Sequence, residues 1–245
     1  MRWLARGESD LPDDRSWLAP TEAGKVASLR NTKRRIEYLL TRWTTKETVV
    51  RLLGLAADHR SFSRIEVRNH VSGAPEAYID GRPLGLAISL TDRAGWAVCL
   101  IGQDPGRVGC DLELVEPRSP GFVRDYLTDD EQRFVAAASD EIGRQVAANL
   151  LWSAKESALK VLRTGLRRDT RSVAVLLSDE PGTGGWAPLT VRTTEGVTLP
   201  GWWRRFGAFL LTVAADRPSA PPVALEDPPA LAAAEPAHSW LARPL

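Results

Sequence analysis

Apolar side chains recur every three or four residues in three stretches of the chain, which predicts amphipathic helices over 23–55, 127–138 and 142–162. Gly54 follows the first stretch as a stop signal. Thr128, with Glu131 three residues later, has the spacing of a capping box at the start of the second. Runs rich in apolar and β-branched residues, bounded by turn residues, predict strands over 62–69, 86–90, 95–101, 108–115, 171–177, 189–194 and 206–215. The mixture predicts an α+β fold.

One pattern occurs twice in the chain, 109 positions apart. The run Trp43-Thr-Thr-Lys46-Glu47 resembles Trp152-Ser-Ala-Lys155-Glu156, and each copy lies late in a predicted helix that a β-like run follows. Two amphipathic helices can converge by chance, but a Trp at both starts favours an internal duplication. A duplication predicts two similar α+β halves, related by a pseudo-twofold axis, with a ligand cleft between them.

The domain boundaries follow from this duplication and from composition. Residues 1–105 form the predicted N-terminal half, and residues 106–215 form the C-terminal half. Residues 216–245 are rich in Pro and Ala, which is typical of a flexible tail.

Charge and hydropathy limit the class of protein. The net charge is +1, so overall charge argues neither for nor against nucleic acid. The two cysteines, Cys99 and Cys110, lie in apolar runs and are expected to be buried thiols. Charged residues interrupt positions 1–18, so we expect no secretory leader there, and no apolar run is long enough to span a bilayer. We therefore expect a cytoplasmic protein that is not bound to a membrane.

A pair of acids stands on the predicted strand Val108-Gly-Cys-Asp-Leu-Glu-Leu. Side chains alternate along a strand, so Asp111 and Glu113 share one face. Two adjacent carboxylates repel each other unless a cation or solvent relieves them, and Mg²⁺ prefers such ligands. The alternative is an edge strand with two solvated acids, and the pattern alone leaves both open.

A second set of polar residues forms a stripe on the helix predicted over 142–162. Trp152, Glu156 and Lys160 are four residues apart and face the same way. A Glu–Lys pair at this spacing is also a common surface stabiliser. Together with the acidic strand, however, Glu156 would supply a third hard ligand and Lys160 a cation for phosphate.

The first predicted helix is strongly basic. Its Lys and Arg residues suit a solvated helix face, a polyphosphate site or a nucleic-acid contact. The near-neutral charge of the whole chain gives nucleic-acid binding no support, and the absence of a known reading motif argues against it. These basic residues are Lys25, Arg30, Lys33, Arg34, Arg35, Arg42, Lys46 and Arg51.

The acidic strand and the Trp-Ser-Ala-Lys-Glu helix, about forty residues apart, resemble the paired signature of the 4'-phosphopantetheinyl transferase superfamily. Gly73-Ala-Pro75 is similar to the family's Gly-Lys-Pro segment, and Ser89-Leu-Thr91-Asp92 to its Ser-His stretch. The basic run that includes Arg35 and Arg42 resembles the coenzyme-binding helix of the longer, two-half, Sfp-like branch.

The resemblance implies an enzyme that transfers phosphopantetheine from coenzyme A to a serine of an acyl or peptidyl carrier protein and releases 3',5'-ADP. Asp111, Glu113 and Glu156 would bind Mg²⁺. Glu156 would also take the serine proton, and with Asp111 and Lys160 it would form the catalytic set. The residues implied in coenzyme A binding are Arg35, Arg42, Lys46, Pro75, Thr91, Asp92, Lys155 and Lys160.

Two positions depart from the family pattern at the nucleotide end of coenzyme A. Asp92 stands where the family has His, and Ala74 where it has Lys. The outcomes left open are weaker coenzyme A binding, tolerance of dephospho-coenzyme A, and loss of activity. The runner-up function is accordingly a non-catalytic relative that binds coenzyme A or a carrier protein. A chain that carries both halves can form a complete site as a monomer.

Overall fold

The structure, a computed structural model, describes residues 1–102, 106–178 and 182–237. The chain divides into two compact units: unit 1 contains residues 1–105 and 223–245, and unit 2 contains residues 106–222. Helices and sheets occur in both units, which confirms the predicted α+β fold. The predicted pseudo-twofold axis and the cleft between the halves stay predictions.

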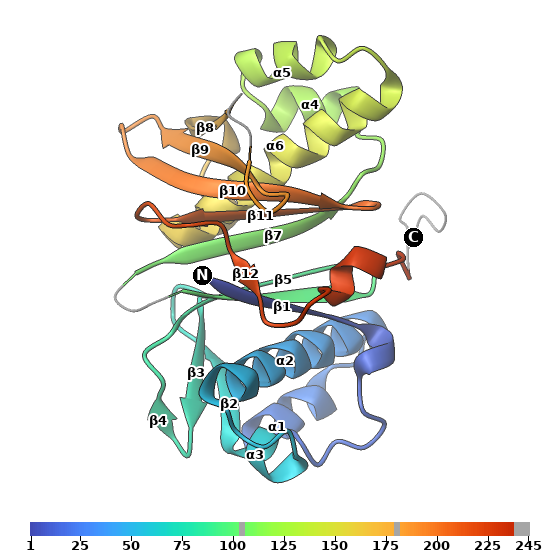
Figure 1. Ribbon diagram of the computed structural model, residues 1–245, viewed down its shortest axis with the longest axis vertical. Coiled ribbons are helices and arrows are strands. Elements are labelled where there is room, and N and C mark those ends of the chain that lie inside the picture. The colour runs from blue at the N-terminus through green and yellow to red at the C-terminus, as the bar shows by residue number, and fades with distance from the viewer. Residues whose placement is uncertain (103–105, 179–181, 238–245) are drawn as a thin grey trace. The chain divides into compact units, whose positions relative to one another are not determined.

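Unit 2 is one five-stranded antiparallel sheet with a long helix across one face. The sheet order is β7-β11-β10-β9-β8, so β7 is an edge strand. Figure 1 shows α6 on the sheet, with α4 and α5 on the far side of α6. The elements are β7 (Val108–Leu114), α4 (Pro120–Tyr126), α5 (Asp129–Ala136), α6 (Glu141–Leu162), η2 (Gly165–Arg167), η3 (Thr170–Ser172), β8 (Val173–Leu177), β9 (Ala187–Thr193), β10 (Thr198–Phe206) and β11 (Phe209–Ala215).

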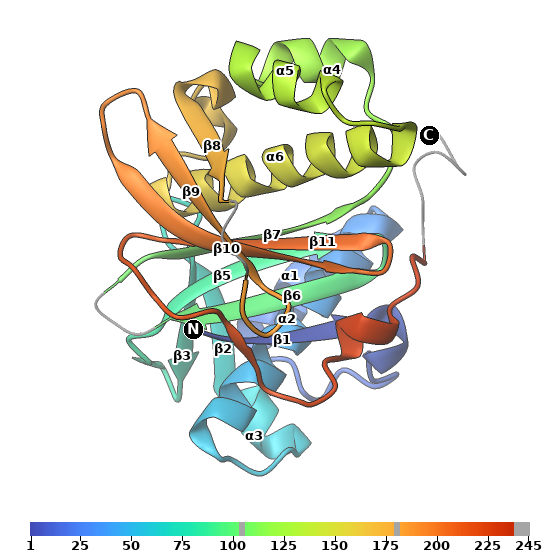
Figure 2. The same ribbon diagram turned by 45° about the horizontal axis from the view of Figure 1, so that its top comes forward.

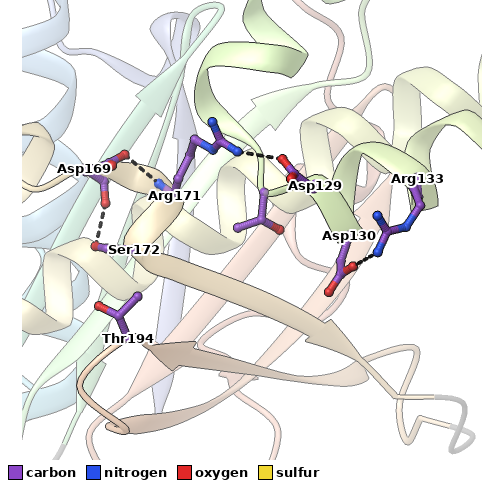
Figure 3. A pocket seen from close by; sticks show the side chains of 8 residues that line it. Asp129, Asp130, Arg133, Asp169, Arg171, Ser172 and Thr194 are labelled. Atoms are coloured by element: carbon purple, nitrogen blue, oxygen red, sulfur yellow. Dashed lines mark hydrogen bonds and ion pairs between the residues drawn. The ribbon is translucent and has the colours of Figure 1, made fainter.

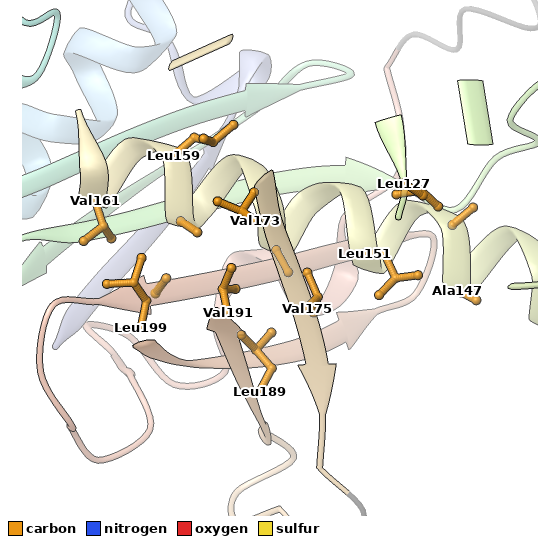
Figure 4. Close-up of a cluster of buried hydrophobic side chains, with 14 of the residues drawn as sticks. Leu127, Ala147, Leu151, Leu159, Val161, Val173, Val175, Leu189, Val191 and Leu199 are labelled. Carbon is orange, nitrogen blue, oxygen red and sulfur yellow. The ribbon is translucent and has the colours of Figure 1, made fainter. Parts of the chain in front are cut away.

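The core of unit 2 lies between α6 and this sheet. Apolar residues of α6, such as Leu151 and Leu159, pack against Val173, Val191 and neighbouring residues of the strands (Figure 4). Burial of this face removes a large apolar area from water and fixes how α6 lies on the sheet. The helix is thereby held along the edge strand β7.

Unit 1 is built from a four-stranded sheet, a second sheet of three strands and three α-helices. Its sheets have the orders β12-β1-β6-β5 and β2-β3-β4, and α2 lies along the larger one (Figures 1 and 2). The elements are β1 (Arg2–Gly7), η1 (Glu8–Asp10), α1 (Pro20–Ser28), α2 (Thr32–Leu53), α3 (His59–Arg64), β2 (Ile65–Asn69), β3 (Pro75–Ile79), β4 (Arg82–Pro83), β5 (Ala87–Arg93), β6 (Trp96–Gly102), β12 (Val223–Ala224) and η4 (Ala230–Ala233).

The long helices of the two units correspond residue for residue. α2 and α6 each contain 22 residues, and each begins after a capping side chain, Asn31 in unit 1 and Asp140 in unit 2. Their starts differ by the same 109 positions that separate the repeated Trp-x-x-Lys-Glu pattern. This correspondence supports the duplication.

Residues 216–237 differ from the predicted flexible tail, and residues 238–245 of that tail lie outside the described residues. Val223 and Ala224 pair in parallel with Arg2 and Trp3 of β1, and Leu231 is fully buried. Glu226 accepts hydrogen bonds from Arg6 and from the amide of Ala230. The Pro-rich composition did not reveal this packing, because one ion pair and one apolar anchor are enough to order a segment without regular helices.

Several predicted elements are present with different bounds. The single helix expected over 23–55 is two, because the chain is extended at Leu29 and Asn31 caps a new helix. Gly54 ends that helix with a φ of 65°, in the left-handed region that glycine adopts most easily. Thr128 and Glu131 form the expected capping box.

Both cysteines are buried free thiols, as expected. Within the part of the chain that the structure describes, no helix is both long enough and apolar enough to cross a membrane.

Candidate active site

The two acids of β7 point toward α6. Gly109 shares their face of the strand, and a Cβ placed on it would lie 1.9 Å from the carbonyl oxygen of Ser157 on that helix. Asp111 and Glu113 continue the same face and are nearly buried, with 7% and 8% of their surface exposed. The glycine of the Val-Gly-Cys-Asp motif is thus the residue that allows the strand and the helix to approach so closely.

The helix stripe predicted from spacing meets these acids. The indole of Trp152 donates to Oε1 of Glu113 at 3.0 Å, and the ammonium of Lys160 lies 3.0 Å from Oδ1 of Asp111. Glu156 lies between Trp152 and Lys160 along the helix. The three helix residues therefore share one face of α6, and that face packs against the acidic strand β7.

Buried hydroxyl groups fix the register of α6 on the sheet. Ser153 and Ser157 both bond to the hydroxyl of Thr212 on β11, at 2.9 and 2.8 Å. Ser153 also donates to the carbonyl of Asp111 at 3.2 Å. All three hydroxyl residues are fully buried, so a shift of the helix would leave polar groups unsatisfied.

The ionisable side chains of the site shift one another's pKa values. Burial raises the pKa of Glu156 to about 7, and the Asp111 and Glu113 carboxylates add to this rise while Lys160 opposes it. Burial disfavours the charged form of Lys160, but the charges of Asp111, Cys110 and Glu156 and the hydrogen bond to Asp111 together outweigh this effect and raise the lysine pKa. Three carboxyl groups thus share one partly buried region with a cation beside them.

Two further residues of the site were missed by sequence reasoning. Arg118, in the loop between β7 and α4, places Nη2 2.9 Å from Oε2 of Glu113. Its Nε donates to Oδ1 of the fully buried Asn149 on α6 at 2.6 Å. Arg118 and Asn149 are 31 positions apart, so no short motif could have connected them.

The acids fit Mg²⁺ by their chemistry. Carboxylate oxygens are the ligands that a hard divalent cation prefers, and Asp111 and Glu113 lie close enough to Glu156 to add to the rise in its pKa that burial causes. Among the described residues, however, no group of three or more His, Cys, Asp or Glu side chains is already arranged around a single metal position. The carboxylates are held by Lys160, Trp152 and Arg118 instead.

Lys155 lies elsewhere, and its predicted role is corrected. Its ammonium group is fully buried and donates to the carbonyls of Thr170 and Val173, at 2.8 and 2.6 Å. It also pairs with Glu131 at 2.8 Å. Five residues of α-helix turn Lys155 well away from the face that carries Lys160. It therefore stabilises unit 2 and does not face a phosphate.

Lys46 has the same arrangement in unit 1, and its predicted role in coenzyme A binding is corrected for the same reason. It is fully buried, donates to the carbonyls of Trp17 and Phe62, and pairs with Glu22 at 2.6 Å. In both units burial lowers the pKa of the lysine against the opposing effect of its carboxylate. Glu22 and Glu131 are also 109 positions apart, so the whole ion pair is repeated.

The acid of unit 1 that corresponds to Glu156 is neutralised by arginine. Glu47 pairs with Arg6 of β1, which also bonds to Glu226 at 2.9 Å. A guanidinium therefore provides the positive charge beside Glu47 in unit 1.

The remaining predicted residues lie in unit 1, and two of them, Arg42 and Pro75, share the neighbour Asn69. Arg42 is nearly buried, stacks on Tyr38 with 4.4 Å from its central carbon to the ring centroid, and contacts Asn69 at 3.4 Å. Pro75 pairs with that same Asn69 across β2 and β3. The Nε of Arg42 has no hydrogen-bond acceptor within the described ranges, which is the state of a guanidinium suited to an anion.

Arg35 and the two residues of β5 complete the set. Arg35 is half-buried on α2, at the polar surface of that helix. Thr91 is buried and Asp92 exposed on β5, an edge strand of the larger sheet of unit 1.

A separate hollow of unit 2 contains none of the predicted site residues (Figure 3). It lies at the start of α5, where Arg171 pairs with Asp129 at 2.6 Å. The remaining lining residues are Thr128, Asp130, Arg133, Asp169, Ser172 and Thr194.

Residues 107–187 match the family model described as the 4'-phosphopantetheinyl transferase superfamily. This match confirms the predicted superfamily and supports a transferase of phosphopantetheine in general terms, whereas the Sfp-like branch stays a prediction. The matched residues include β7, α4, α5 and the whole of α6, and therefore every residue described at the acidic site except Thr212. No curated protein matches the chain.

Proposed function

We propose that the chain transfers 4'-phosphopantetheine from coenzyme A to a serine of an acyl or peptidyl carrier protein, with Mg²⁺, and releases 3',5'-ADP. The observation that carries this proposal is the group of three acids, Asp111, Glu113 and Glu156, between β7 and α6, with Lys160 beside them. Such a cluster suits the pyrophosphate of coenzyme A, because that group needs a divalent cation and a fixed positive charge.

The residues of the cluster divide the proposed step among them, and Glu156 has two tasks. The carrier serine oxygen attacks the β-phosphorus of coenzyme A, the new O–P bond forms, and the bond from that phosphorus to 3',5'-ADP breaks. Glu156 accepts the serine proton, and Lys160 faces the phosphate oxygens. Asp111, Glu113 and Glu156 would hold Mg²⁺, which supplies charge neutralisation when it is bound.

Unit 1 would bind the nucleotide end of the coenzyme. The nearly buried guanidinium of Arg42, with an Nε that still lacks an acceptor within the described ranges, supports this assignment, and Arg35 adds positive charge on the same helix. Asp92 adds a negative charge on β5, and this charge would weaken the binding of a 3'-phosphate. Pro75 and Thr91 would complete this side of the site.

The proposal is tested by incubating a panel of apo-carrier proteins with the chain, coenzyme A and Mg²⁺, followed by intact-protein mass spectrometry. We expect one carrier or more to gain the mass of one phosphopantetheine, and EDTA to abolish the gain. The production of 3',5'-ADP in equal amount checks the balance of the reaction. Bound coenzyme A without any mass gain would instead support the non-catalytic relative that Asp92 suggested.

A further inference from the structure

The guanidinium of Arg118 is a positive charge placed directly on one of the proposed metal ligands. Its Nη2 lies 2.9 Å from Oε2 of Glu113, and only 16% of the arginine side chain is exposed. Oε1 of the same carboxylate accepts from Trp152 at 3.0 Å. One oxygen of Glu113 therefore accepts a hydrogen bond from the indole, and the other forms an ion pair with the guanidinium.

The position of Arg118 is built into the fold. Asn149 uses its amide nitrogen to donate to the carbonyls of Glu116 and Gln145, at 2.7 and 2.8 Å. Its amide oxygen is thereby directed at Nε of Arg118, 2.6 Å away. The guanidinium also lies over the ring of Phe122, with 4.7 Å from its central carbon to the ring centroid. An arginine held on three sides is not a mobile surface charge.

We propose that Arg118 is a positioning residue that acts as a fixed counter-cation for Glu113, holding this carboxylate until a divalent cation competes for it. The inference rests on the proposed function, since it takes Glu113 as a metal ligand. Arg118 holds the Glu113 carboxylate in place beside Trp152. A divalent cation that binds Glu113 must offset the loss of this ion pair and the repulsion of the guanidinium.

The same reasoning explains the arrangement of the acids. Lys160 stands in the same relation to Asp111 as Arg118 does to Glu113, so each strand acid has a cation of its own. Carboxylates directed at separate cations do not converge on one point, which agrees with the lack of a finished metal group among the described side chains. Cation binding is then a local exchange of partners, and it requires no movement of β7.

The test measures the binding of Mn²⁺ alone, without coenzyme A, by isothermal titration and by the electron paramagnetic resonance of the free ion. Arg118→Met removes the charge but keeps much of the apolar stem that lies over Phe122. We expect it to bind Mn²⁺ about tenfold or more tightly, since a partly buried charge pair is worth about that factor. Arg118→Lys keeps the charge and should bind Mn²⁺ with nearly the wild-type affinity.

Controls separate this effect from a change in overall charge or folding. Arg124→Met removes an exposed arginine of α4 that pairs with its neighbour Asp125, and should leave Mn²⁺ affinity unchanged. Arg118→Gln, which is neutral and keeps a donor for Asn149, decides the matter if Arg118→Met does not fold. If Arg118 served only folding, its loss would weaken Mn²⁺ binding or leave it unchanged. Either result in folded Arg118→Met or Arg118→Gln overturns the inference.

Asp111→Asn in the same experiment distinguishes this inference from the proposed function. If the wild type binds Mn²⁺ and Asp111→Asn does not, the site is a cation site, and only the Arg118 variants decide the role of the guanidinium. If Asp111→Asn binds Mn²⁺ as the wild type does, or the wild type does not bind it, the proposed metal ligands are wrong and the inference falls with them.

Discussion

The buried lysine of the repeated motif is predicted to stabilise unit 2 rather than to bind the substrate. The perturbation is Lys155→Met, which replaces the ammonium by an apolar group of similar length. It leaves the carboxylate of Glu131 buried without its cation, and the carbonyls of Thr170 and Val173 without their donor. Glu131 would keep its amide donors, Thr128 at 2.7 Å and Val175 at 2.8 Å.

The magnitude follows from this geometry. Removing one member of a buried ion pair costs about 3–5 kcal/mol, because the remaining charge stays desolvated. Both members of this pair are at most 3% exposed, so solvent screening does not reduce the effect. For a chain of this size each kcal/mol lowers the unfolding temperature by about 2–4 °C, so we expect a fall of about 6–20 °C.

Thermal and urea unfolding followed by circular dichroism measure this loss. Lys46→Met removes the matching lysine of unit 1 and should cost a similar free energy, since Glu22 and two carbonyls lose the same contacts. Lys33→Met is the control, because this lysine is half exposed and lies 3.8 Å from Glu37 on the helix surface. Its cost should stay below about 0.5 kcal/mol.

One result would refute the reasoning for Lys155. If Lys155→Met unfolds as the wild type does, while the KM for coenzyme A rises, the lysine contacts the coenzyme after all. The prediction instead requires the loss of stability, with an almost unchanged KM in the molecules that remain folded.

Three further changes test other parts of the account. Gly109→Ala should cost about 1–3 kcal/mol or more and impair transfer, because the new methyl group would push β7 away from the backbone of α6; an unchanged urea midpoint would contradict this. Glu226→Ala should cost about 1–3 kcal/mol and speed hydrogen exchange over residues 223–237, because Arg6 and the amide of Ala230 lose their acceptor; exchange at the wild-type rate would contradict it. Asp92→His should tighten coenzyme A binding in calorimetry and leave dephospho-coenzyme A unchanged, and equal effects on both ligands would exclude the 3'-phosphate as the cause.

Local patterns predicted much of the acidic site, since alternation along a strand and four-residue spacing along a helix need no knowledge of distant residues. Asp111, Glu113, Glu156 and Lys160 were placed on two faces, and these faces meet in the structure. The same patterns did not show which face of the helix Lys155 occupies relative to Glu131. Spacing along an element shows which residues share a face, but it does not show which other element packs against that face.

The elements that the sequence concealed depend on distant charge pairs. Strand β1 was not predicted, because Arg2 and Arg6 interrupt its apolar pattern. Arg6 is nevertheless almost buried, since Glu47 and Glu226 neutralise it from 41 and 220 positions away. Glu226 belongs to the segment whose Pro and Ala content suggested a flexible tail. The burial of Arg6 and the ordering of the segment around Glu226 each depend on the other residue, so neither could be predicted from its own stretch of sequence.

The most direct test of the acidic cluster compares Asp111→Asn with the wild type in single-turnover transfer to a carrier protein, followed by intact-protein mass spectrometry. Asp125→Asn, an exposed acid on α4, is the matched control. The account predicts that Asp111→Asn unfolds at nearly the wild-type temperature and loses transfer by at least about a hundredfold, while the control keeps its activity. Wild-type transfer by a folded Asp111→Asn variant would contradict the assignment of the β7–α6 cluster as the active site.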